Sequence, residues 1–109
     1  MADISIIIPV YNEELAIEKT ILEIKKAIFG LKHRLEIIAV NAGSKDKTSE
    51  ILKKIKGIKA IDHPYNKGYG SSIKTGIKAS KAEWILITDA DGTYPIKDIP
   101  KLISYINDY

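Results

Sequence analysis

Short apolar runs alternate along the chain with segments whose apolar residues recur at helical spacing. The runs at residues 4–8, 37–40 and 85–87 are almost continuously apolar, and a weaker run at 58–61 is interrupted by Lys59. Strands buried on both faces of a sheet have such continuous runs, whereas half-exposed strands alternate apolar and polar residues. The four runs therefore predict four interior strands of one sheet.

Helical spacing fills the gaps between these runs. The first such segment carries isoleucines on one helix face, at positions 17, 21, 24 and 28. Asn12 is expected to cap this helix and Gly30 to end it. Further helices are predicted over residues 46–56, 69–80 and 98–107. This alternation predicts an α/β fold, a three-layer sandwich in which helices cover both faces of a mostly parallel sheet.

Composition and charge narrow the class of protein. The chain has 109 residues, 45% hydrophobic and 28% charged, as in one soluble domain, and its net charge of +3 suits an anionic small ligand rather than nucleic acid. The absence of cysteine excludes disulfides, a thiolate zinc site and a cysteine nucleophile. No apolar run approaches the roughly 20 residues of a membrane helix. Asp3, Glu13 and Glu14 around the first run exclude a signal peptide. The lack of cysteine indicates a reducing setting, so we expect a cytoplasmic protein.

The residues after each strand are the candidates for chemistry, because parallel sheets bind ligands beyond the carboxyl ends of their strands. These segments are residues 9–14, 41–48, 62–70 and 88–92. All four are expected to meet at one edge of the sheet.

The sharpest feature in these segments is the pair Asp89 and Asp91. Residues two apart in an extended segment point the same way, so the two carboxylates are expected to form one negative spot. Mg²⁺ or Mn²⁺ would relieve the repulsion and leave coordination positions open for phosphate oxygens. The alternative is two loop aspartates, one capping a helix and one solvated.

The other loops carry weaker signals. The loop at residues 66–71 presents backbone N–H groups at a helix start, where anions bind, although a simple surface turn is an equal alternative. Ile73 stands where a dinucleotide fingerprint would have a third small residue. Ser44 or Asp46 is expected to cap the second helix. His33 and His63 lack partners at metal-ligand spacing and are interpreted as ordinary surface or loop residues.

Four blocks in order resemble a known family. They are residues 6–14 (Ile-Ile-Ile-Pro-Val-Tyr-Asn-Glu-Glu), 41–48 (Asn-Ala-Gly-Ser-Lys-Asp-Lys-Thr), 66–70 (Asn-Lys-Gly-Tyr-Gly) and 89–95 (Asp-Ala-Asp-Gly-Thr-Tyr-Pro). Together they resemble the inverting family 2 glycosyltransferases of the GT-A fold. The last two blocks are most similar to the branch of dolichyl- or polyprenyl-phosphate sugar synthases.

The resemblance implies a sheet order of 3-2-1-4 and the nucleotide-binding half of a nucleotide-diphospho-sugar transferase. It implies a UDP- or GDP-linked sugar as donor, Mg²⁺ or Mn²⁺ as cofactor, and a polyprenyl phosphate as acceptor in a longer parent protein. Asp91 would hold the metal, with Asp89 near the metal or the ribose. The implied nucleotide-binding residues are Pro9, Tyr11, Glu13, Val40, Asn41, Ala42, Lys67, Asp89 and Ala90.

Two departures from the family pattern change the expected activity. The family has an aspartate, often two, directly before the Gly-Ser of the second block, where this chain has Asn41 and Ala42. Losing a charge-assisted hydrogen bond to the base or ribose costs about 1.5–3 kcal/mol of affinity. The chain also ends before the acceptor half that carries the usual catalytic base, so we expect it not to transfer sugar alone.

Two other classes of function are weighed against this one. A non-catalytic nucleotide- or metal-binding module would bind the donor without releasing nucleoside diphosphate. A phosphoacceptor signalling domain needs acidic residues after the first strand and an aspartate after the third, and this chain has its aspartate pair after the fourth.

The fourth strand would form an uncovered apolar edge, which predicts a homodimer. The parent protein is expected in the cytoplasm or at the cytoplasmic face of a membrane.

Overall fold

The computed structural model describes residues 2–93 and 95–108. Its four strands are β1 (Ile4–Val10), β2 (Leu35–Asn41), β3 (Lys59–Asp62) and β4 (Trp84–Ile87). They form one sheet in the order β3-β2-β1-β4, and every neighbouring pair is parallel. The predicted parallel sheet and its order are confirmed.

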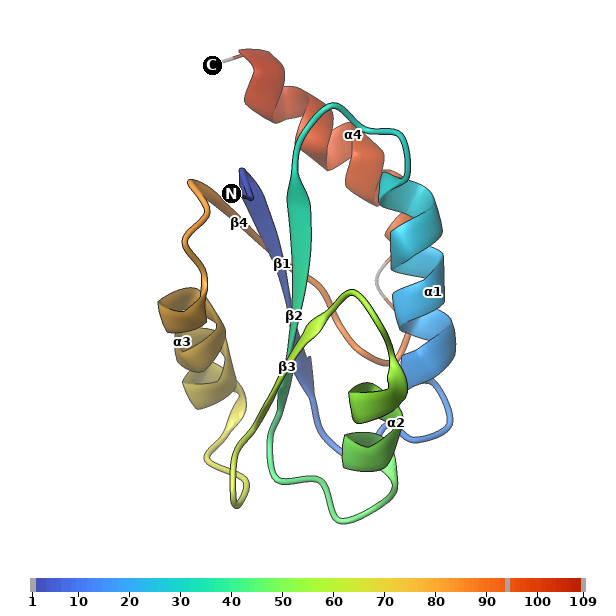
Figure 1. The fold of residues 1–109 in the computed structure, drawn as a ribbon, viewed down its shortest axis with the longest axis vertical. Coiled ribbons are helices and arrows are strands. Elements are labelled where there is room, and N and C mark those ends of the chain that lie inside the picture. Colours follow the sequence, from blue (N-terminus) through green and yellow to red (C-terminus); the bar gives the residue numbers. More distant parts are fainter. Residues whose placement is uncertain (1, 94, 109) are drawn as a thin grey trace.

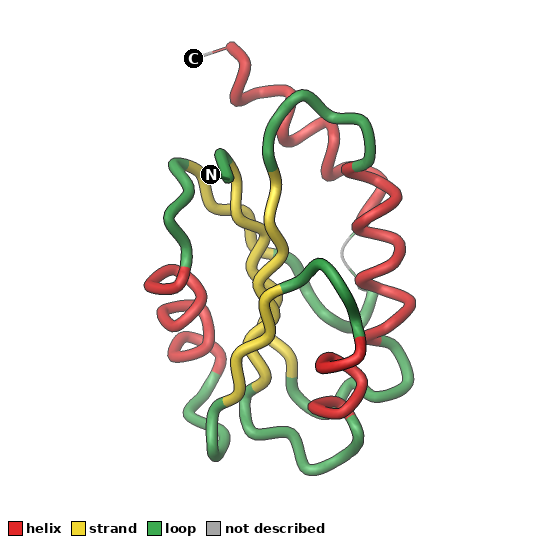
Figure 2. The backbone as a smooth tube through the Cα atoms, in the orientation of Figure 1, coloured by secondary structure: helices red, strands yellow, loops and turns green. Residues whose placement is uncertain are grey.

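The helices cover both faces of this sheet (Figures 1 and 2). Helix α3 (Tyr69–Ala79) lies on one face. The other face is covered by α1 (Ile17–Ile28), α2 (Thr48–Lys54) and α4 (Ile99–Ser104), the last flanked by the short 3₁₀ helices η1 (Ile96–Asp98) and η2 (Tyr105–Asp108). The predicted three-layer arrangement is therefore present. None of the helices in the described part of the chain is long and apolar enough to cross a bilayer.

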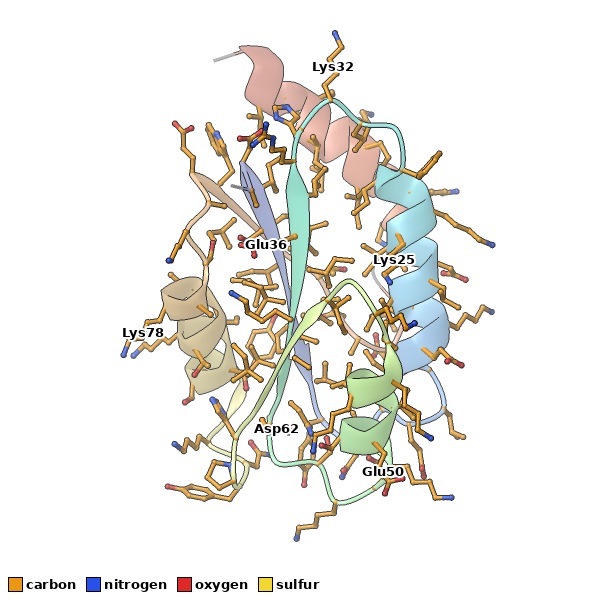
Figure 3. All side chains as sticks on the ribbon, in the orientation of Figure 1. Lys25, Lys32, Glu36, Glu50, Asp62 and Lys78 are labelled. Atoms are coloured by element: carbon orange, nitrogen blue, oxygen red, sulfur yellow. The ribbon has the colours of Figure 1, made fainter. Side chains whose placement is uncertain are left out.

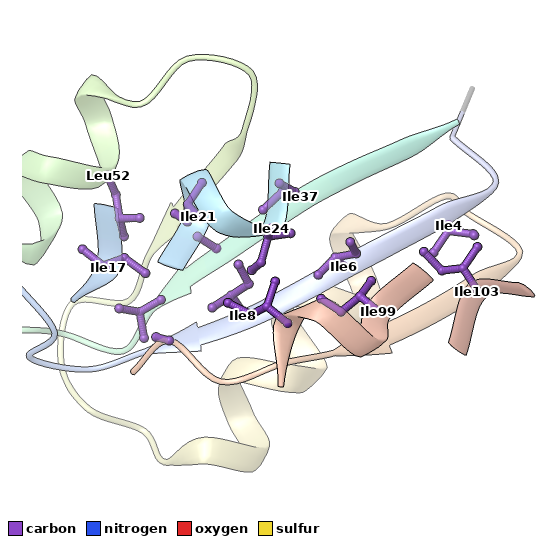
Figure 4. Packing of buried hydrophobic residues seen from close by; sticks show 14 residues of the cluster. Ile4, Ile6, Ile8, Ile17, Ile21, Ile24, Ile37, Leu52, Ile99 and Ile103 are labelled. Atoms are coloured by element: carbon purple, nitrogen blue, oxygen red, sulfur yellow. The ribbon is translucent and has the colours of Figure 1, made fainter. Parts of the chain in front are cut away.

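Strand β1 supplies the core on both sides of the sheet. Ile4, Ile6 and Ile8 are fully buried against α1 and α4, together with the inward isoleucines of α1 (Figure 4). Ile7 points the other way and forms a smaller cluster with Ile38 and Val40 beneath α3. Each fully buried isoleucine contributes about 1.5–3 kcal/mol relative to exposure, so the sheet is held by its apolar residues on both faces.

Helix α3 approaches the sheet closely because it carries a glycine at the contact. A Cβ added to Gly76 would lie 2.6 Å from Cγ2 of Ile7 and 3.1 Å from its Cδ1. Both Gly76 and Ile7 are buried, so the neighbouring side chain has little room to yield.

Two predicted helix starts differ from the structure. Helix α1 begins at Ile17, and Asn12 does not cap it: Asn12 has a φ of 50°, and its Oδ1 accepts a hydrogen bond from the backbone N–H of Lys45. Helix α2 begins at Thr48, because Asp46 accepts hydrogen bonds from the Thr48 N–H and hydroxyl before the helix starts.

The fourth strand forms one end of the sheet, as expected. Trp84, Ile85 and Ile87 on β4 are each more than one third exposed, which leaves an apolar surface at this edge. The pairing of two chains through this edge stays a prediction.

The close contact of α3 with β1 predicts a difference between two glycine substitutions in one helix. Gly76→Ala should lower the free energy of unfolding by about 1–3 kcal/mol, because the new methyl group displaces Ile7. Gly70→Ala adds a methyl group with nothing within 4 Å and should be neutral or stabilising by about 0.5–1 kcal/mol. Urea denaturation measures both, and equal stability of the two variants would contradict the proposed contact.

Candidate functional site

The loops that follow the strands meet at one edge of the sheet and enclose a hollow of about 220 Å³. The hollow is formed by the end of β1 and the segments that follow β1, β2 and β3, with the first turn of α3. Its lining residues are Pro9, Val10, Tyr11, Ala42, Asn66, Gly68, Tyr69 and Ser72. The expected meeting of these segments is therefore present in the structure.

Side chains join the loop after β1 to the loop after β2. The backbone N–H of Asn12 donates to Oγ of Ser44 at 2.8 Å, and Oδ1 of Asn12 accepts from the Lys45 N–H at 2.8 Å. The Glu13 N–H donates to Oγ1 of Thr48 at 2.9 Å. Because buried or constrained backbone groups need partners, these bonds fix the path of both loops. They position Tyr11 and Glu13 at the edge of the hollow.

Asn41 organises the bottom of this edge through both ends of its amide. The side chain is 2% exposed. Its Nδ2 donates to Oδ1 of Asp62 at 3.0 Å, while its Oδ1 accepts from the hydroxyl of Ser44 at 2.5 Å. The amide thus connects the ends of β2 and β3 and holds the turn that contains Gly43.

The loop after β3 packs on that turn by backbone contact. Gly43 has a φ of +73°, and a Cβ there would lie 2.5 Å from the carbonyl carbon of Tyr65. Further along this loop, Oδ1 of Asn66 accepts from the Gly68 N–H at 2.8 Å, and the ammonium of Lys67 lies 5.3 Å from the Tyr65 ring centroid. The shape of the hollow therefore depends on a glycine at position 43.

The start of α3 gives the hollow a positive end. Gly68 precedes the helix, and no side chain caps its first turn in the described structure. The first turn contains no acidic residue, and Lys67 comes directly before Gly68. Unpaired N–H groups and the helix dipole make such a terminus attractive to anions.

The predicted carboxylate pair lies after β4 and shares one hydroxyl. Oγ1 of Thr93 lies 2.7 Å from Oδ1 of Asp91 and 3.5 Å from Oδ2 of Asp89. The Thr93 N–H also donates to Asp91 at 3.0 Å. These hydrogen bonds from Thr93 hold the pKa of Asp91 below its ordinary value of 3.8, so this carboxylate is ionised at neutral pH.

Glu13 lies within the field of two other carboxylates. Desolvation raises its pKa above the ordinary value of 4.5, and the charges of Asp91 and Asp46 raise it further. Desolvation also opposes ionisation of Asp46, but the hydrogen bonds from Thr48 outweigh it and lower the pKa of Asp46. The carboxylates after β1, β2 and β4 therefore form one negative region, and a cation near it would relieve their repulsion.

The carboxylates of this region do not make up a complete metal coordination sphere by themselves. Within residues 2–93 and 95–108, no group of three or more His, Cys, Asp or Glu side chains is placed to hold a metal ion by itself. Asp89 and Asp91 offer oxygen ligands of the kind that Mg²⁺ and Mn²⁺ prefer. The donor set fits a hard cation that takes its other ligands from water or a bound phosphate.

The structure places the predicted nucleotide-binding residues in three environments. Pro9, Tyr11 and Ala42 line the hollow, and Glu13, Lys67 and Asp89 lie at the same sheet edge. Val40 and Ala90 are buried in the core clusters, and Asn41 is buried beneath the loops. Their nucleotide contacts stay predictions. Tyr94, part of the fourth sequence block, lies outside the described residues.

Several lining residues were missed in the predicted set. Val10 belongs to β1 itself, and Tyr69 and Ser72 belong to the first turn of α3. The sequence signal for the α3 residues was the glycine-containing loop at 66–71, which marks a helix start but does not show which side chains face a ligand.

His63 is a loop residue directly after β3, as interpreted, but it does not lie on the surface. Its side chain is 9% exposed beneath α3, and its Nε2 lies 2.8 Å from Oγ1 of Thr75. Its Nδ1 is buried without a hydrogen-bond partner among the described residues. His33 lies on the surface side of the fold, with Nδ1 3.7 Å from Oδ2 of Asp3.

The backbone contact at Gly43 predicts the effect of two matched substitutions. Gly43 and Gly30 both have positive φ, so alanine strains either position by about 1–2 kcal/mol. Only at Gly43 does the methyl group meet another backbone segment, whereas nothing lies within 4 Å at Gly30. Gly43→Ala should therefore lose at least about 1 kcal/mol more stability than Gly30→Ala in urea denaturation. Equal losses would mean that the loop after β3 adjusts freely.

The carboxylate cluster predicts a coupled titration. Asp91→Asn removes one of the charges that raise the pKa of Glu13, so that pKa should fall toward 4.5. NMR titration of the Glu13 side-chain carboxyl carbon measures the change. Asp98→Asn, which alters an aspartate at the start of α4, is the matched control and should leave Glu13 unchanged. An unaltered Glu13 titration in Asp91→Asn would show that the charge of Asp91 does not act on Glu13.

Known proteins are similar in sequence to this chain. The family model for glycosyl transferase family 2 matches residues 5–109. Dolichyl-phosphate hexose transferase of Haloferax volcanii is 34% identical over 106 residues, covering 97% of this chain and 44% of that protein. Undecaprenyl-phosphate 4-deoxy-4-formamido-L-arabinose transferase of Pseudomonas fluorescens is 32% identical over 108 residues, covering 93% and 31%. The chain therefore spans less than half the length of these relatives.

Solved structures share its fold. Residues 1–349 of TarS from S. aureus, in complex with UDP-GlcNAc, superpose with a TM-score of 0.81 at 26% identity, covering 97% of this chain and 31% of that one. A mannosyltransferase from Pyrobaculum calidifontis, in complex with GDP-Man and Mn²⁺, gives a TM-score of 0.78 at 23% identity, covering 89% and 30%. The sequence blocks, the sheet order and the match over residues 5–109 lead to one assignment: this chain belongs to glycosyl transferase family 2.

Proposed function

We propose that this chain binds the nucleotide-diphosphate sugar donor of a metal-dependent, inverting glycosyltransferase. The observation that carries the proposal is the common position of the hollow, the α3 N-terminus and the Asp89–Asp91 pair at one sheet edge. A nucleoside would occupy the hollow between Pro9, Tyr11 and Ala42. Tyr11 is 40% exposed, which leaves its ring accessible to a base.

The charges at this edge complement a diphosphate bound with a cation. The α3 N-terminus and Lys67 would attract the phosphate oxygens. Asp89 and Asp91 would hold Mg²⁺ or Mn²⁺, and the ion would act as a Lewis acid for the departing nucleoside diphosphate. Thr93 keeps Asp91 ionised and oriented through its two hydrogen bonds. Glu13 adds negative charge near the cation without being one of its proposed ligands.

The acceptor is proposed to be a polyprenyl phosphate bound by a longer protein. The two curated relatives described above act, by their names, on dolichyl phosphate and undecaprenyl phosphate, and each extends well beyond the matched region. A lipid acceptor would place the reaction at the cytoplasmic face of a membrane. We propose that the 109-residue chain by itself binds donor without transferring sugar.

The substitution at the second block bears on the affinity for the nucleoside. Ala42 lines the hollow and is 5% exposed, so the wall is apolar where the resemblance implies a carboxylate. The carboxylate of an Ala42→Asp variant would offer an acceptor to the base or ribose. If that contact forms, nucleotide affinity should rise about ten- to a hundredfold.

Thermal unfolding with nucleotides tests the proposal. The chain should be stabilised by either UDP or GDP in the presence of Mn²⁺ or Mg²⁺, and less by the nucleotide alone. Ligand at 100 times its dissociation constant adds about 2.7 kcal/mol, which moves the melting temperature by several degrees. Asp91→Asn should abolish the metal-dependent part of the shift.

Asp98→Asn is the matched control for this experiment, because Asp98 lies at the start of α4 and outside the hollow. It should keep the full shift. The absence of any shift with both nucleotides, on a chain that unfolds cooperatively, would refute the donor site. Release of nucleoside diphosphate from a donor sugar by the chain alone would instead refute the view that it only binds.

A further inference from the structure

The outer surface of α1 carries apolar side chains that the core does not use. Leu22 is 49% exposed and Phe29 is 89% exposed, and Leu15 before the helix is 98% exposed. Phe29 directly follows the last residue of α1, and Leu22 and Phe29 line one shallow hollow on the outside of the helix. The buried isoleucines of α1 occupy the opposite side. The outward apolar residues are therefore not part of the fold's interior.

Lysines surround these apolar side chains. Lys25 and Lys26 line a shallow hollow together with Leu22 and Phe29. Lys26 also lines the adjoining hollow between α1 and the start of α4, which includes Lys97 and Pro100. Pro100 in turn borders a third hollow that includes Lys32. We call this continuous surface of α1, the following loop and α4 the α1–α4 face.

Three acidic residues, Glu18, Glu23 and Asp98, lie on or beside this face, and Glu18 is exposed one helical turn before Leu22. The carboxylate of Glu23, which borders one of the hollows, lies 3.9 Å from Nζ of Lys19. Asp98 is adjacent to Lys97 and borders a neighbouring hollow with Lys101. The face therefore keeps an excess of positive charge.

The carboxylates of the candidate donor site lie elsewhere, at the carboxyl edge of the sheet. Figure 3 shows Lys32 at the end of the molecule opposite Asp62, and Lys78 on the far side of the sheet on α3.

We propose that the α1–α4 face docks on an anionic lipid surface. Protruding apolar side chains among lysines suit an interface where the apolar groups enter the headgroup region and the ammonium groups remain with phosphates. A second copy of the same face would bring like charges together and is disfavoured by them. The proposal extends the proposed function, because it names the surface that would hold the protein at a membrane, but it does not depend on donor binding.

Vesicle co-sedimentation tests this proposal. The chain should bind vesicles of equal parts phosphatidylglycerol and phosphatidylcholine at low salt, and bind pure phosphatidylcholine vesicles far less. Lys26→Gln with Lys97→Gln should weaken binding about 25-fold, at about fivefold per lysine. Leu22→Ser with Phe29→Ser should weaken it at least about tenfold. Added salt should also weaken binding, because it screens the lysines.

Matched variants on α3 show whether vesicle binding depends on the α1–α4 face or only on the number of lysines in the chain. Lys74, Ile77 and Lys78 are exposed on the opposite side of the sheet. Lys74→Gln with Lys78→Gln, and Ile77→Ser, should leave vesicle binding unchanged. Equal loss in both sets, or no binding to anionic vesicles by the folded chain, would overturn the proposal. Concentration-dependent dimerisation that Phe29→Ser abolishes would assign the face to a second copy instead. The nucleotide-induced thermal shift of each variant reports independently on the donor site.

Discussion

The parallel pairing of β1 with β2 on one side and β4 on the other is the constraint on which the rest of this structure depends. Parallel strands end at the same edge, so this pairing brings together segments that are distant in sequence. It requires β1 to be buried from both faces, which its isoleucines satisfy. The hollow, the α3 terminus and the aspartate pair share one edge because β1 is central. The order of the strands therefore brings these groups together, and the individual residues then decide what they can bind.

The two ends of the molecule differ in electrostatic character. At the carboxyl edge, the charges of Asp46 and Asp91 help to raise the pKa of Glu13. Local hydrogen bonds lower the pKa of each of the two aspartates, so they remain charged. Such a region is stabilised by a bound cation, in the same way that paired carboxylates are stabilised in metal sites. On the α1–α4 face, Lys26, Lys32 and Lys97 are exposed, and their ammonium groups attract anions. A small domain can therefore separate two binding tasks by placing them on different elements.

The strand and helix pattern could be predicted from sequence because the isoleucines repeat at the periods that each element imposes. The common edge of the loops followed from the parallel topology. Side-chain placement around that edge could not be predicted in the same way. Val40 and Ala90 adjoin motif residues, but the direction of each side chain puts them in the core. His63 is buried only because α3, which comes later in the chain, covers the end of β3.

Long-range side-chain bonds account for the remaining differences. Asn12 had the chemistry of a helix cap, yet its oxygen meets the backbone of Lys45 on another loop. The residues next to Asn12 in the sequence do not show whether its side chain caps a helix or bonds another loop, because in both cases it accepts from a backbone N–H group. Tyr69 and Ser72 reach the hollow because Gly76 lets α3 approach the sheet, a relation between two elements rather than a property of either.

The amide of Asn41 has a consequence for how this chain can change over evolution. It donates to Asp62 and accepts from Ser44, whereas the carboxylate of an aspartate could only accept. An aspartate at position 41 would face the carboxylate of Asp62 where the amide nitrogen now lies 3.0 Å away. The single substitution Asn41→Asp should therefore lower the stability of the fold, because it sets two carboxylates against each other. An aspartate at position 41 would therefore be tolerated better together with a neutral residue at position 62 than with Asp62.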